Sequence, residues 1–255
     1  MEFTLVLTLF LALFIGISLG LLGGGGAILA VPVLTAVTGL DASHAIPTSL
    51  LIVGATSLVS LGLHAAKKRV NWQVGLIFGL AAMAGAFLGG RLGTLVPSPV
   101  LMLSFAAVML AAAFAMIRGG REAKDDDGSS RLPILKIILV GAAVGLVSGF
   151  VGAGGGFLIV PALTLLARFP MRTAVATSLL VITMQSAAGL QGYLVSVSID
   201  WALAFAVAGI AVLGSFFGFW LAGRMPDRGL RKGFGWFVLV VALFVAGGEF
   251  IALLP

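Results

Sequence analysis

The stretch GLLGGGGAILAVPVL, from Gly20 to Leu34, places four consecutive glycines inside an apolar segment that carries no charge. Glycine in a helix interior costs about 1 kcal/mol relative to alanine. Unpaired backbone groups are tolerated at membrane depth only where protein buries them or water reaches them. The stretch therefore predicts a membrane helix that is broken at Gly23–Gly26.

The rest of the chain has the composition of a membrane protein. Its 255 residues are 60% hydrophobic and only 9% charged, whereas soluble domains carry about 25% charged residues. The lack of cysteine excludes disulfides and thiolate metal sites, and the net charge of +6 fits positive-inside topology better than nucleic-acid binding. We expect an all-α polytopic membrane protein with eight apolar segments: Phe3–Val37, Ala45–Ala66, Trp72–Val96, Val100–Ile117, Leu132–Ala167, Thr173–Tyr193, Trp201–Gly223 and Phe234–Leu254.

The two halves of the chain repeat at an offset of 129 residues. GGGGAILAVPVLT (Gly23–Thr35) aligns without a gap on GAGGGFLIVPALT (Gly152–Thr164), and AIPTSLL (Ala45–Leu51) aligns on AVATSLL (Ala174–Leu180). A constant register of this kind indicates internal duplication. We predict a first membrane repeat (1–117), a hydrophilic linker (118–131) and a second membrane repeat (132–255).

The basic residues predict how these repeats sit in the membrane. If all eight segments crossed once, the 15 basic residues would divide almost evenly between the two faces, against the positive-inside rule. If Phe3–Val37 and Leu132–Ala167 fold back at their glycines, every basic residue except Arg91 lies on one face. Positions that are basic in one half, such as Lys67, then match uncharged positions in the other half. This is typical of inverted-topology repeats. Both termini would lie outside and the linker in the cytoplasm; two continuous tilted spans remain the alternative.

The glycine turns are the candidate binding site. The helical limbs that follow them begin with N–H groups that have no intrahelical partner, and such N-termini bind anions. The paired Thr-Ser elements can donate hydroxyls to an oxyanion or can bond to a carbonyl of their own helix, and Gln185 is a further polar candidate. By contrast, small-xxx-small spacing predicts close helix packing for Gly85, Gly89, Gly93, Gly214 and Gly218. The predicted substrate-binding residues are Gly23, Gly24, Gly25, Gly26, Thr48, Ser49, Gly152, Gly154, Gly155, Gly156, Thr177, Ser178 and Gln185.

Two further residues are candidates for gating or for proton or anion access. His64 precedes Lys67-Lys68-Arg69, and its ring either takes part in access or extends to the headgroups. Arg91, the lone outer basic residue in the fold-back topology, either lies at the outer mouth or contacts headgroups. No carboxylate is clearly central in a segment, so the sequence predicts no relay of buried acids.

These paired motifs resemble the sulfite exporter TauE/SafE family of bacterial membrane permeases. The resemblance rests on GLLGGGGAILAVPVL (Gly20–Leu34), on GFVGAGGGFLIVPAL (Gly149–Leu163) and on the two TSLL elements, and it extends over nearly the whole chain. It implies a multi-pass protein of the bacterial inner membrane that exports sulfite, sulfonates or related organic anions, driven by an ion or substrate gradient. The half-sites differ, since Pro47 matches Ala176 and Ala27 matches Gly156.

The sequence therefore predicts a secondary transporter of a small anion that works by alternating access. The alternative is an anion channel whose pore the glycine turns would line. An enzyme is disfavoured because no paired histidines, central acid pair or Ser-His-Asp set is present, and we expect no metal or other cofactor. The expected partners are the anionic substrate, the lipid bilayer and a coupling proton or cation.

Overall fold

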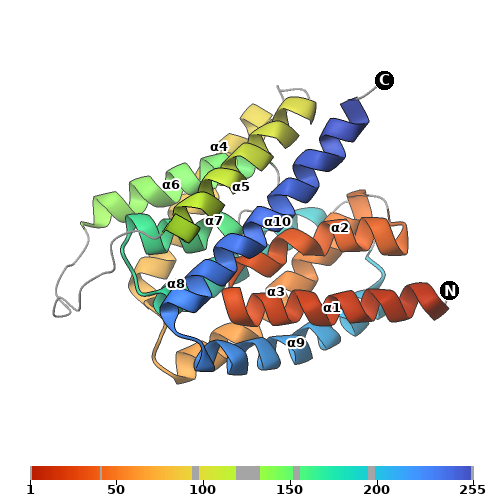
Figure 1. The fold of residues 1–255 in the computed structure, drawn as a ribbon, viewed down its shortest axis with the longest axis horizontal. Coiled ribbons are helices and arrows are strands. Elements are labelled where there is room, and N and C mark those ends of the chain that lie inside the picture. The colour runs from red at the N-terminus through yellow and green to blue at the C-terminus, as the bar shows by residue number, and fades with distance from the viewer. Residues whose placement is uncertain are drawn as a thin grey trace.

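Helices make up nearly all of the chain that the structure describes. The computed structural model describes residues 2–40, 42–93, 98–118, 133–151, 156–194 and 199–253, and these ranges contain no β-strand (Figure 1). The elements are α1 (Glu2–Leu22), η1 (Gly24–Gly26), α2 (Ala27–Thr38), α3 (Ala42–Ala66), α4 (Trp72–Gly93), α5 (Ser98–Arg118), α6 (Ile134–Val151), α7 (Gly156–Pro161), η2 (Ala162–Leu166), α8 (Met171–Leu194), α9 (Trp201–Arg224) and α10 (Asp227–Leu253).

Four of the described helices, α3, α4, α8 and α9, are long and apolar enough to cross a membrane. Large apolar side chains are exposed on the outside of the bundle, among them Phe10, Phe87 and Phe244, as a lipid-facing surface requires. The expectation of a polytopic all-α membrane protein is confirmed at this level. The predicted linker 118–131 lies, apart from Arg118, outside the described residues.

The first apolar segment is broken and folds back on itself. Gly23 has φ +69°, a conformation that glycine adopts without steric cost, and the 3₁₀ turn η1 connects it to α2. A β-carbon on Gly26 would touch the carbonyl oxygen of Ile15, and Leu34 packs in one cluster with Ala12. The chain therefore reverses at the glycines, and α2 runs back beside α1 (Figure 1).

The matching segment of the second half has the same course. α7 and η2 form one helical stretch, in which η2 is a π-helix. Leu163 of this stretch clusters with Ile137 near the start of α6, which places the two limbs side by side. The limbs also end alike, because Gly39 and Arg168, which are 129 residues apart, both have positive φ, at +70° and +56°.

Each half packs its first helix on the other half. α1 lies along α9, and α4 lies along α6. A β-carbon on Gly16 would collide with the backbone of Ala211, and one on Gly145 would collide with the backbone of Ala82. These two contacts are equivalent under the offset of 129 residues.

Three of the five glycines predicted to serve helix packing agree with this arrangement. A β-carbon on Gly85 would collide with the carbonyl of Ala142, and one on Gly214 would collide with the matching carbonyl of Leu13. Gly218 meets α1 in the same way, at Ile17. Small residues therefore let the backbones of the paired helices approach closely.

Candidate functional site

The first glycine turn, Gly23–Gly26, contacts the start of α7. Gly24, Gly25 and Gly26 are buried. A β-carbon on Gly24 would collide with the carbonyl oxygen of Gly156 and would lie 3.0 Å from the nitrogen of Phe157. The backbone of the turn thus lies directly against the first residues of α7, and only a residue without a side chain fits there.

The starts of α2 and α7 are neighbours as well. A β-carbon on Gly156 would lie 3.5 Å from the β-carbon of Ala27 and 3.2 Å from the Ile182 side chain of α8. Ala27 and Gly156 match each other in the repeat. Two helical segments therefore begin at adjoining positions, and the N–H of Ala27 donates to the Gly25 carbonyl within the first turn. Gly152, Gly154 and Gly155 lie outside the described residues.

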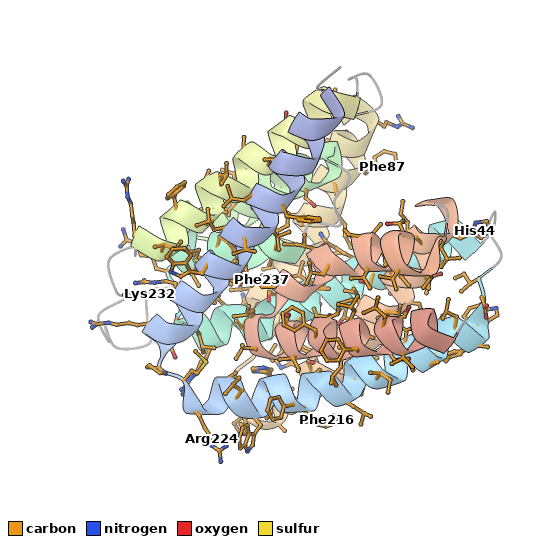
Figure 2. The ribbon with its side chains drawn as sticks, turned by 45° about the vertical axis from the view of Figure 1, so that its right-hand side comes forward. His44, Phe87, Phe216, Arg224, Lys232 and Phe237 are labelled. Atoms are coloured by element: carbon orange, nitrogen blue, oxygen red, sulfur yellow. The ribbon has the colours of Figure 1, made fainter. Side chains whose placement is uncertain are left out.

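α8 and α10 cover the first turn. A β-carbon on Gly23 would lie 2.7 Å from Oγ of Ser178, and one on Gly25 would lie 3.3 Å from the Phe237 ring. Figure 2 marks Phe237 on α10. Sequence reasoning missed Phe237 because an aromatic residue in an apolar helix gives no signal of what it covers.

Most hydroxyls of the Thr-Ser elements bond to their own helices in this structure. Thr48 Oγ1 donates to the His44 carbonyl at 2.7 Å, Ser49 Oγ donates to the Ile46 carbonyl at 2.7 Å, and Ser178 Oγ donates to the Val175 carbonyl at 2.8 Å. Each hydroxyl would have to leave its carbonyl before it could donate to an oxyanion.

Thr177 instead connects two helices. Its Oγ1 accepts from the backbone N–H of Asn71 at 3.1 Å, and Asn71 Oδ1 accepts from the N–H of Val74 at the start of α4 at 3.1 Å. Asp200, which matches Asn71 in the repeat, caps α9 in the same way: its Oδ1 accepts from the N–H of Leu203. Thr177 therefore holds the entry to α4 against α8.

We expect Thr177→Val to destabilise the protein by about 1–2 kcal/mol, because the Asn71 N–H loses its acceptor. The melting temperature should fall by about 2–4 °C per kcal/mol for a chain of this size. Thr177→Ser keeps the acceptor and should melt like the unmodified protein. Equal melting of Thr177→Val and the unmodified protein would show that this hydrogen bond contributes nothing.

None of the remaining predicted residues, Gln185, Arg91 and His64, is among the nearest neighbours of a β-carbon on the glycines of the turns that the structure describes. Gln185 is half-buried in α8, and Arg91 is exposed near the end of α4. The Arg91 guanidinium stacks over the Phe87 ring at 4.8 Å from the centroid. His64 is only 1% exposed, and its ring meets the Phe219 ring edge-on at 4.8 Å. A ring buried in this way does not extend to the lipid headgroups.

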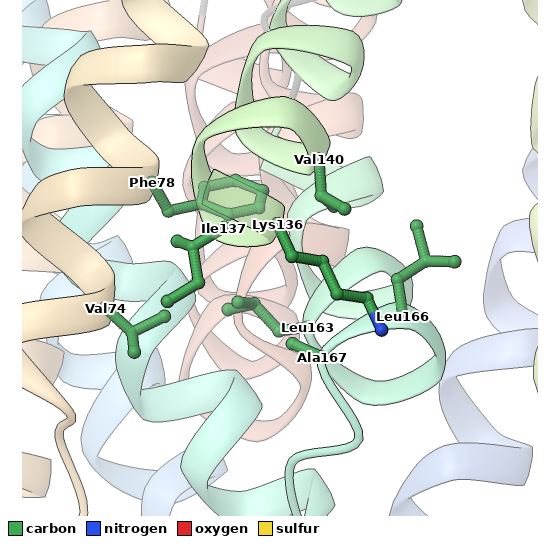
Figure 3. A pocket seen from close by; sticks show the side chains of 8 residues that line it. All are labelled: Val74, Phe78, Lys136, Ile137, Val140, Leu163, Leu166 and Ala167. Atoms are coloured by element: carbon green, nitrogen blue, oxygen red, sulfur yellow. The ribbon is translucent and has the colours of Figure 1, made fainter. Parts of the chain in front are cut away.

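The cavity in Figure 3 lies apart from the glycines, between α4, α6 and η2. Phe78, Ile137 and Leu163 line it, and the exposed Lys136 lies at its edge. Its volume of about 10 Å³ is room for about one water molecule. A hydrated oxyanion does not fit there.

Comparison with known proteins identifies the family of this chain. The model of the sulfite exporter TauE/SafE family matches residues 8–245. This chain belongs to that family. A probable membrane transporter protein of Xylella fastidiosa is 38% identical over 240 residues, covering 91% of this chain and 90% of the relative. The probable membrane transporter protein MJ0441 of Methanocaldococcus jannaschii is 32% identical, covering 76% of this chain and 75% of the relative.

The names of these relatives describe membrane transport rather than catalysis. YunE of Bacillus subtilis, 31% identical over 84% of this chain and 85% of its own length, is also named a probable membrane transporter protein. No solved structure matches this TauE/SafE chain. Membership of a transporter family agrees with the multi-pass helical fold.

Proposed function

We propose that this TauE/SafE protein is a secondary transporter that carries a small oxyanion, such as sulfite or a sulfonate, by alternating access. The observation that carries the proposal is the contact of Gly24 with Gly156, which brings the starts of α2 and α7 together. Helix N-termini bind anions without a basic residue, and glycine lets backbone N–H groups approach a ligand closely. The direction we propose is export from the cytoplasm of a bacterial inner membrane.

We further propose that the halves 1–117 and 132–255 are inverted repeats. The reciprocal packing of α1 on α9 and of α4 on α6 supports this, because each half then makes the same contacts with the other. Transporters of this architecture bind substrate near the midplane, at broken helices between the repeats. Both termini would lie outside, the linker 118–131 in the cytoplasm, and Arg91 near the outer mouth.

The proposed binding residues are those of the two glycine turns and the neighbouring polar side chains. The first turn and the start of α7 are in contact, and we propose that this conformation is a closed state of the site. Such contact favours a carrier over an anion channel, which needs a continuous pore. The set consists of Gly23–Gly26, Gly152, Gly154–Gly156, Thr48, Ser49, Thr177, Ser178 and Gln185.

A thermal-shift screen tests the proposal. Sulfite, sulfate, thiosulfate, small sulfonates and small carboxylates are added to the purified protein, with chloride at equal ionic strength as the control. A ligand at a hundredfold excess over its Kd stabilises the folded state by about 2.7 kcal/mol. We expect one or more oxyanions to raise the melting temperature by several degrees. A flat response to the whole panel would contradict an oxyanion site.

Counterflow separates the carrier from the channel. If the protein is a carrier, vesicles preloaded with unlabelled substrate take up labelled substrate faster than empty vesicles do. The reason is that a substrate-loaded site reorients to the outer face faster than an empty one. The proposed coupling to a proton or cation gradient is read in the same proteoliposomes. Voltage-driven current without acceleration by preloaded substrate would favour the channel instead.

A further inference from the structure

One face of α3 carries buried polar side chains that have no partner. Ser57 and Ser60 are 0% exposed and His64 is 1% exposed. The two hydroxyls have no hydrogen-bond partner, and neither ring nitrogen of His64 makes a hydrogen bond of ordinary geometry, although the backbone of Gly20 lies close enough to interact with the ring. Steps of three and four residues place all three side chains on one helix face. They are called here the α3 polar row.

Such a row is unusual because nearly all buried polar groups in proteins are hydrogen-bonded. Each unpaired group costs about 1–3 kcal/mol. The neighbouring hydroxyl of Thr56 is also fully buried, yet it donates to the Ile52 carbonyl at 2.7 Å. The helix therefore satisfies a hydroxyl directly beside the row but leaves the two serine hydroxyls of the row without a partner.

The row begins near the level of the glycine turns. A β-carbon on Gly54 of α3 would lie 3.0 Å from the Ser186 β-carbon of α8, and Ile182, one helical turn before Ser186, lies against Gly156. Ser57 follows Gly54 one turn of helix later. From Ser57 to His64 the row extends about 10 Å along α3, at about 1.5 Å per residue.

The other end of the row meets the basic loop after α3. Phe219 of α9 meets the edge of the His64 ring, and the Lys67 ammonium lies over the Phe219 ring at 4.8 Å from the centroid. Lys68 and Arg69 follow Lys67. The row thus connects the glycine turns to the side of the membrane that the charge pattern assigns to the cytoplasm.

We propose that the α3 polar row is a second anion-binding site, on the cytoplasmic route to the glycine turns. Two hydroxyls and an imidazole can all donate hydrogen bonds to an oxyanion. Lys67 and Arg69 attract anions to this end and repel cations. This inference rests on the proposed transport of a small oxyanion. It adds a second position at which the anion binds as it enters from the cytoplasm.

The second half has no matching row, which makes the site specific to one side of the membrane. The positions that correspond to Ser57, Ser60 and His64 are Ser186, Gly189 and Tyr193. Only the first of these keeps a serine. Loss of the row should therefore weaken binding of substrate that arrives from the cytoplasm, and leave binding from the outside unchanged.

The test compares Ser57→Ala and Ser60→Ala in inside-out and right-side-out vesicles, with ³⁵S-labelled sulfite as the probe. Thr56→Val is the matched control, since its hydroxyl is already bonded to the helix. We expect the cytoplasmic half-saturation concentration to rise about tenfold in each serine variant, the loss of one hydrogen bond to a charged group. The outer half-saturation concentration should not change, and Thr56→Val should behave like the unmodified protein on both sides.

Melting temperature provides the second measurement. Removal of an unpaired buried hydroxyl should leave the melting temperature equal or raise it, so weaker transport cannot be attributed to misfolding. Serine variants that transport like the unmodified protein on both sides, or that weaken both sides equally, would overturn the second site and leave the proposed function standing. Unmodified protein that carries no sulfite from either side would overturn the proposed function, and this inference with it.

Discussion

Gly24→Ala is expected to reduce sulfite transport at least tenfold while the protein still inserts into the membrane. The new β-carbon would collide with the carbonyl of Gly156. The obstacle is backbone, which cannot rotate away as a side chain can. The starts of α2 and α7 must therefore separate, and misplacement of binding groups by about 1 Å can cost about a hundredfold in rate.

Two other glycines serve as controls for this variant. A β-carbon in Gly25→Ala would lie 3.3 Å from the Phe237 ring and in ordinary contact with the Leu22 β-carbon at 3.5 Å; because a ring can shift, we expect a smaller loss. Gly209→Ala has nothing within 4 Å and should transport normally. Transport is measured in proteoliposomes that contain equal amounts of each protein. Normal transport by Gly24→Ala would show that the contact between the turn and α7 is not needed.

Gly16→Leu is expected to have the largest effect on folding. Its side chain would enter the space occupied by the backbone of Ala211 and separate α1 from α9. Overpacking of an ordinary core site costs about 1–3 kcal/mol. Here the obstacle is backbone along a whole helix pair, so we expect more than about 3 kcal/mol and little folded protein after extraction.

The repeat makes this prediction sharper. Gly145→Leu would separate α6 from α4 at the matching backbone of Ala82, so it should fail to the same degree. Gly62→Leu, which has open space around it, is the control. The recovered monodisperse fraction and its melting temperature are the measurements. Stable protein from either packing variant would contradict the close helix contact.

The sequence was informative where glycines occur in an unusual cluster or at a regular spacing. Four glycines in an apolar segment predicted the break before α2, and the spacing of Gly85, Gly214 and Gly218 predicted close helix contacts. It could not predict that α1 packs on α9 of the other half. The sequence of an apolar helix without a strongly one-sided pattern does not indicate which helix it packs against. Helix pairing depends on the three-dimensional fit of the whole bundle.

Hydroxyl side chains in a membrane helix are ambiguous in the sequence. Thr48, Ser49 and Ser178 bond to their own helix here, and Thr177 bonds to Asn71. Ser57 and Ser60 look the same in sequence, yet among the buried hydroxyls that the structure describes these two have no partner. The difference depends on rotamers and neighbours, which only the folded structure defines.

The opposite orientation of the two halves is the claim on which the proposed site depends, and single cysteines test it. The chain has no cysteine of its own, so Gly39→Cys and Arg168→Cys each introduce one labelling position. Both residues are exposed, and they match in the repeat. A membrane-impermeant maleimide added to intact cells is expected to label Gly39→Cys, and to label Arg168→Cys only after the membrane is opened. Labelling of both from the same side would contradict inverted halves.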